Sequence, residues 1–101
     1  MVGGAKATGR YLHDSGVHHL LVDLPSVDRL FDEGKLNNHH HFWGFERGAD
    51  IPETALSKSI TEMVYIPDTL QDGSYLLNLQ FAAFQSDAAP SRPLLYSLAP
   101  A

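Results

Sequence analysis

A mostly apolar run at residues 17–24 constrains the fold of this chain more than any other feature. It reads Val-His-His-Leu-Leu-Val-Asp-Leu, directly follows Gly16 and stops at Pro25. Such a run is typical of a strand buried on both faces. Residues 5–15 contain Ala, Lys, Arg and Leu and end at this glycine, which predicts a short helix. A helix followed by a buried strand indicates at least one crossover within a mixed sheet.

The remainder of the chain alternates short elements with polar connections. Asn37 or Asn38 can cap a short helix that continues through Trp43 and ends at Gly44. Residues 45–59 are typical of a surface loop, and further strands are predicted at residues 59–65, 74–84 and 94–98. We therefore expect an α+β (mixed α/β) fold, with a mixed β-sheet and short helices, in a single domain spanning residues 1–101.

Charge and composition exclude several classes of partner. The formal net charge is -5, and the seven Lys and Arg residues are scattered singly. Without a basic stripe, we expect no nucleic acid and no anionic membrane as partner. No cysteine is present, so any metal must be held by His, Asp or Glu. No secretory signal or membrane span is visible, and we expect a cytoplasmic protein.

Histidines and acids are concentrated between residues 18 and 44. This stretch contains five of the six histidines and the only tryptophan. Imidazole nitrogen and carboxylate oxygen are ligands of zinc and manganese. The three consecutive histidines His39, His40 and His41 cannot all face one metal, because successive helical residues point in different directions. A solvated helix start therefore stays an alternative to metal binding.

Two acids stand among apolar neighbours. Glu62 shares a predicted strand face with apolar residues, and a buried carboxylate needs a partner. A metal would satisfy it, and so would an arginine such as Arg29 or Arg92. Asp23, near the end of the first predicted strand, could accept hydrogen bonds from Ser26 or nearby amides. The sequence contains no nucleophile elbow and no glycine-rich phosphate loop. Metal-dependent catalysis is therefore the enzymatic mechanism for which the sequence offers candidate residues.

Four blocks of sequence, in order, resemble the C-terminal part of the cyclase family of metal-dependent hydrolases. This family includes bacterial kynurenine formamidase (arylformamidase) and isatin hydrolase. The resemblance covers most of the chain. The blocks are Val-Asp-Leu-Pro-Ser-Val-Asp-Arg at residues 22–29, Asn-His-His at residues 38–40, Ile-Thr-Glu at residues 60–62, and residues 73–80 with residues 91–93.

The resemblance implies a swivelling β/β/α arrangement and hydrolysis of amide C–N bonds by a metal-bound water. It implies zinc or manganese as cofactor and a small-molecule amide as substrate. Members carry a metal-binding His at the start of a short helix and a Glu on the next strand, which match His39 and Glu62. We expect these two residues to be metal ligands, with Asp23 and Arg29 shaping the loop beneath them. We assign no catalytic residue to the chain.

The family signature His-x-Gly-Thr-His-x-Asp-x-Pro-x-His, which supplies most ligands and the acid–base histidine, is absent from the sequence. We therefore expect a site that is incomplete on its own and has little activity, either with zinc or manganese bound or without a metal. Either the chain is truncated, or another chain completes its site. Exposed strand edges favour self-association, so we expect a homo-oligomer. The alternative is a non-catalytic oligomerisation or interaction module derived from the same fold.

Overall fold

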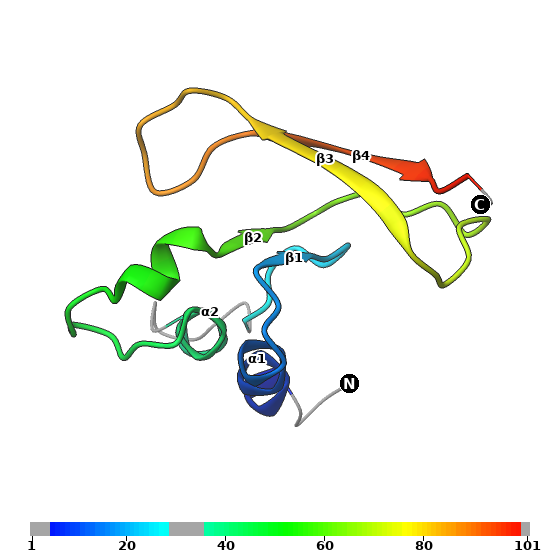
Figure 1. The fold of residues 1–101 in the computed structure, drawn as a ribbon. Coiled ribbons are helices and arrows are strands. Elements are labelled where there is room, and N and C mark those ends of the chain that lie inside the picture. Colours follow the sequence, from blue (N-terminus) through cyan, green and yellow to red (C-terminus); the bar gives the residue numbers. More distant parts are fainter. Residues whose placement is uncertain (1–4, 29–35, 100–101) are drawn as a thin grey trace. The chain divides into compact units, whose positions relative to one another are not determined.

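The computed structural model describes residues 5–28 and 36–99 of the chain. Contacts divide the chain into two units, Met1–Tyr65 and Ile66–Ala101, and each is described by itself. The first unit contains both α-helices and two short strands, and the second contains a hairpin (Figure 1). The single domain expected from the sequence stays a prediction.

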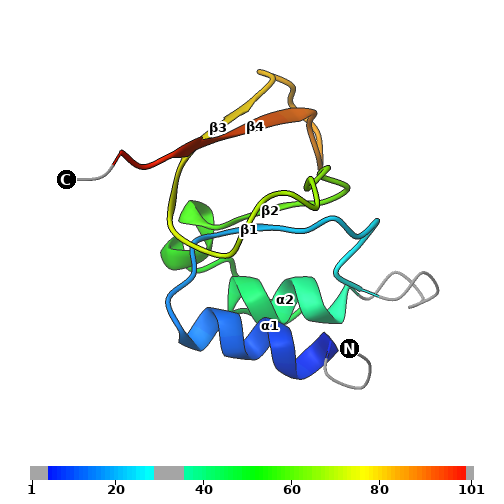
Figure 2. The same ribbon diagram turned by 90° about the vertical axis from the view of Figure 1, so that its right-hand side faces the viewer.

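Two helices pack against each other in the first unit. They are α1, Ala5–Asp14, and α2, Asn37–Trp43, and they lie side by side in both views (Figures 1 and 2). Gly9 permits this approach, because a Cβ there would lie 2.9 Å from the backbone oxygen of Asn38 and closer still to its side-chain oxygen. Both predicted helices are confirmed.

Two short strands of the first unit form a parallel pair. They are β1, His19–Leu21, and β2, Ser59–Thr61, with Leu20 opposite Ile60. Parallel strands need a long crossover connection, and here the segment between them contains α2. The predicted crossover is therefore present, but among the described residues it joins a purely parallel pair and not the strands of one mixed sheet.

The extent of both strands differs from the prediction. β1 covers three residues and is not buried on both faces, since His19 is exposed and the two leucines are half-buried. β2 ends before Glu62. Met63 has a φ of 61°, a left-handed conformation that interrupts an extended strand. Glu62 consequently lies at a bend just beyond the strand, rather than in its middle.

The predicted surface loop at residues 45–59 contains a short 3-10 helix, η1, Glu53–Ser57. It is closed by hydrogen bonds from the Ala55 N–H to the Pro52 oxygen (3.0 Å) and from the Lys58 N–H to the Ala55 oxygen (3.1 Å). The prediction of a loop over the whole of residues 45–59 was therefore wrong in part, because residues 53–57 form this helical turn.

The core of the first unit is small. Among the described residues, Phe42 of α2 and Ala55 of η1 are the buried apolar side chains, and Phe42 is completely buried. The Lys58 ammonium lies 4.7 Å from the centre of the Phe42 ring and donates a hydrogen bond to the Val17 oxygen (2.7 Å). These contacts join α2, η1 and the start of β1.

The second unit is an antiparallel hairpin of β3, Tyr75–Phe81, and β4, Ser91–Ser97. The strand predicted at residues 74–84 is confirmed over residues 75–81, with half-buried side chains at Tyr75, Leu77 and Leu79, whereas Phe81, expected on the same face, is exposed. β4 begins earlier than the predicted residue 94 and includes Pro93. Each strand of a two-stranded sheet is an edge strand, where a proline without an N–H is tolerated.

Two helices with one parallel and one antiparallel strand pair confirm the mixed α+β class. In the part of the chain that the structure describes, no helix has the length and apolar character needed to cross a bilayer.

Candidate metal centre

The start of α2 is held by a carboxylate from elsewhere in the chain. The residue preceding the helix, Leu36, is in a left-handed conformation and provides no side-chain cap. Instead, Asp28 accepts hydrogen bonds from the backbone N–H groups of Asn38 (2.7 Å, Oδ1) and His39 (3.0 Å, Oδ2). These are donors that an N-cap side chain would otherwise satisfy, so Asp28 acts as a remote cap.

The loop that carries Asp28 is held locally as well. The Asp28 N–H donates to Oγ of Ser26 at 3.0 Å, a turn that serine favours. The side-chain amide of Asn38 donates to the Val27 oxygen at 2.9 Å. The loop and the helix start therefore fix each other, and His39 lies at their junction.

His39 lies between two carboxylates. Its Nδ1 is 2.7 Å from Oδ2 of Asp28, and its Nε2 is 2.8 Å from Oε1 of Glu62. The side chains of His39, Asp28 and Glu62 are 11%, 9% and 24% exposed, respectively. Water therefore competes only weakly for these contacts, and it competes least at Asp28, which is the least exposed of the three side chains.

The surroundings of Asp28 favour its ionised form. Burial raises the pKa of this carboxyl, but hydrogen bonds from the His39 side chain and from the backbone N–H groups of Asn38 and His39 lower it by more. The pKa of Asp28 consequently lies below its ordinary value. An ionised Asp28 is an acceptor only, so Nδ1 of His39 must carry a proton, and Nε2 is the ring nitrogen facing Glu62.

The residues fit part of a metal site. An imidazole that donates its Nδ1 proton to a carboxylate and leaves Nε2 for a cation is a recurrent arrangement in zinc proteins. Two ligands of one tetrahedral zinc lie about 3.4 Å apart, whereas His39 and Glu62 are 2.8 Å apart. A small displacement of the Glu62 side chain would therefore make room for a cation between the two groups.

The fit is incomplete within this chain. Catalytic zinc is usually held by three protein ligands and a water. Across residues 5–28 and 36–99, no group of three or more His, Cys, Asp or Glu side chains could surround a metal ion. One imidazole and one carboxylate, such as those of His39 and Glu62, would therefore need at least one further ligand to hold a catalytic zinc.

Other residues singled out in the sequence lie elsewhere. Asp23 is exposed, and the support expected from it comes from Asp28, which sequence reasoning missed. Arg29 lies outside the described residues. His18 and His19 are both exposed, although opposite faces of the strand predicted at residues 17–24 would have buried one of them. Nδ1 of His19 lies 2.8 Å from Oγ of Ser59.

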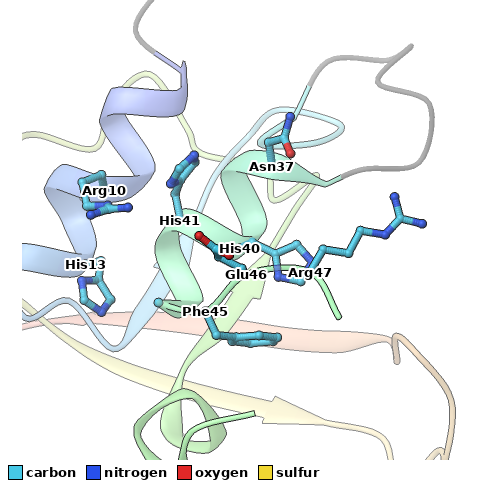
Figure 3. Close-up of a pocket in the computed structure, with 9 residues that line it drawn as sticks. Arg10, His13, Asn37, His40, His41, Phe45, Glu46 and Arg47 are labelled. Atoms are coloured by element: carbon cyan, nitrogen blue, oxygen red, sulfur yellow. The ribbon is translucent and has the colours of Figure 1, made fainter. Parts of the chain in front are cut away.

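His40 and His41 do not join this cluster. The His40 ring packs edge-on against Trp43 (5.4 Å between centres) and Phe45 (5.0 Å), and these two rings stack on each other (6.0 Å). His40 and His41 line a pocket (Figure 3) whose lining includes none of Asp28, His39 and Glu62.

Comparison with known proteins places this sequence beside formamidase-type hydrolases. The relative found is a kynurenine formamidase of Bacillus cytotoxicus (strain DSM 22905 / CIP 110041 / 391-98 / NVH 391-98). The two sequences are 34% identical over 89 residues, which is 87% of this chain and 36% of that protein. The chain therefore spans little more than a third of the relative's length. No family model and no solved structure matches the chain.

Proposed function

We propose that this chain is the C-terminal part of a metal-dependent hydrolase acting on amide C–N bonds, in which His39 and Glu62 bind the metal. The observation that carries the proposal is the position of the His39 imidazole, with Asp28 on one ring nitrogen and Glu62 on the other. The similarity to a kynurenine formamidase supports the reaction class.

Each of the three side chains has a defined part. Nε2 of His39 and a carboxylate oxygen of Glu62 would hold zinc or manganese, and Asp28 holds the Nδ1 proton and orients the ring. When bound, the cation would supply a Lewis acid for an amide carbonyl and a more acidic water. The missing ligands would come from a segment or a chain that also carries the acid–base histidine.

Metal titration of the purified chain tests this assignment. Calorimetry with Zn²⁺ and Mn²⁺ should show one site whose affinity falls in His39→Gln and in Glu62→Gln. The matched controls are His18→Gln and Glu53→Gln, which alter an exposed imidazole and an exposed carboxylate. Equal affinity in all five proteins would contradict the assignment of the ligands.

Activity distinguishes a complete site from a partial one. With metal added, the chain alone should hydrolyse N-formylkynurenine and small cyclic amides at or near the uncatalysed rate, because at least one ligand and the acid–base group are missing. Robust turnover that is lost in Glu62→Gln would support the hydrolase and refute the incomplete site.

A second candidate function, a non-catalytic oligomerisation module, is favoured by the β3–β4 hairpin. An isolated two-stranded hairpin is marginally stable in water, and Leu76, Phe81 and Leu95 are 59%, 75% and 48% exposed. Such a hairpin gains stability by pairing with a second copy. Sedimentation should then show a dimer that dissociates in Leu76→Lys, together with no specific metal site.

A further inference from the structure

A pocket in the first unit is not used by the proposed metal centre. It has a volume of about 300 Å³, and its residues are drawn in Figure 3. Its walls come from α1, from α2 and from the segment that follows α2. The lining residues are Arg10, His13, Asn37, His40, His41, Gly44, Phe45, Glu46 and Arg47.

Close packing between α1 and the end of α2 shapes this pocket. A Cβ at Gly44 would lie 2.8 Å from Cδ2 of His13 and closer still to Nε2, so the imidazole occupies space that any other residue would fill. Gly44 also has a φ of +89°, a conformation that L side chains rarely adopt. The His13 side chain is half-buried with Nε2 at Gly44, and its Nδ1 is 3.0 Å from Oδ1 of Asp14.

The pocket is basic, although the chain is acidic. The whole chain has a formal charge of -5, but the pocket is lined by two arginines, Arg10 and Arg47, and by a single acid, Glu46. Three of the six histidines also line it. Among the described residues, Nδ1 of His40 is buried without a hydrogen-bond partner, so a polar group in this region remains unsatisfied.

We propose that this pocket binds a small oxyanion, either a carboxylate or a phosphate. A guanidinium matches the paired oxygens of both groups and forms charge-assisted hydrogen bonds with them. The Asn37 amide and the His13 imidazole are further possible hydrogen-bond donors in the lining. The site is separate from the metal centre, because successive residues of a helix point about 100° apart and His39 is not part of the lining.

Titration of the full chain with inorganic phosphate and, separately, with acetate tests the proposal. Chemical shifts of arginine side chains and backbone amides should change in a saturable manner at Arg10, Gly44 and Arg47. Tighter binding of phosphate would identify a phosphate site, and tighter binding of acetate a carboxylate site. Absence of saturation with both anions would overturn the proposal.

Charge variants separate a built site from general attraction. Arg10→Gln and Arg47→Gln should each weaken binding of the preferred anion about tenfold, as the loss of one charge-assisted hydrogen bond predicts. Arg92→Gln, which changes an exposed arginine in the hairpin, should leave binding unchanged. An equal effect of all three would refute the site. The amide spectrum of each variant checks that the fold is intact. If Arg10→Gln perturbs α1, the test rests on Arg47→Gln, because Arg47 lies outside both α-helices.

Discussion

Nδ1 of His39 lies 2.7 Å from Oδ2 of Asp28, and the same oxygen accepts the His39 backbone N–H at 3.0 Å. One carboxylate therefore fixes both the backbone and the ring of the proposed ligand. Rotation of the imidazole away from Glu62 would break its contact with the same carboxylate that holds the start of α2. The orientation of the ligand and the position of the helix are thus coupled.

Asp28→Asn should weaken metal binding without removing a ligand. The amide could not hold the Nδ1 proton as an ionised acceptor does, and loss of such a partner typically costs about 10–100-fold in metal affinity. Calorimetry with Zn²⁺ measures the change. Asp23→Asn, which alters an exposed acid near the same loop, is the control and should bind as wild type does. Unchanged affinity in Asp28→Asn would refute the positioning role.

The stability that Asp28 confers should depend on pH in a defined direction. The folded-state pKa of Asp28 is lowered by its hydrogen bonds, whereas an unfolded aspartate titrates near about 3.9. The contribution is then fully present above about pH 5 and is lost as the pH falls through the folded-state pKa. Urea unfolding of wild type and Asp28→Asn should show a difference that shrinks from about pH 5 to about pH 3. A difference that stays constant over this range would contradict the ionised cap.

Gly9→Ala should destabilise the chain despite the higher helix propensity of alanine. The propensity gain is about 1 kcal/mol, whereas the added methyl would collide with Asn38, whose backbone oxygen would lie 2.9 Å away. Overpacking of this kind costs about 1–3 kcal/mol, so we expect a net loss of up to about 2 kcal/mol. Gly73→Ala is the control, because its nearest atom would be 4.0 Å away. Denaturant unfolding measures both, and a stabilised Gly9→Ala variant would contradict the tight helix contact.

Phe42→Ala should be the most damaging substitution in the first unit. Phe42 is completely buried, and truncation of such a residue costs about 3–5 kcal/mol. This is a large share of the ordinary stability of a small domain, so amide exchange should accelerate throughout α2. Phe84→Ala, at a residue that is 62% exposed, should have little effect. Equal effects of the two variants would show that Phe42 is not the centre of the core.

Local sequence patterns predicted the presence of the helices and strands better than the residues at which they begin and end. The glycines at positions 16 and 44 and the alternation in residues 75–81 are local signals, and the corresponding helices and strand are present. The end of β2 was not predictable in this way, because nothing in the sequence indicates the left-handed φ of Met63. A similar difficulty applies to Asp28, whose partner N–H groups are ten and eleven residues away.

The proposed metal ligands were selected by the family resemblance and not by local sequence patterns alone. Position 39 is one of three adjacent histidines, and only the family resemblance distinguished it from its neighbours. The structure brings its imidazole within 2.8 Å of Glu62, while His40 contacts aromatic rings. Sequence reasoning placed the carboxylate support at Asp23, an acid near the end of the predicted strand, whereas the structure shows Asp28 in this position.

The short contact between His39 and Glu62 depends on the register of the parallel pair β1–β2. A slip of one residue between the strands would carry Glu62 about 3.3 Å along the sheet, which exceeds the whole 2.8 Å separation. The imidazole signal of His39 in a nuclear magnetic resonance spectrum would therefore report whether the two strands have paired in the native register.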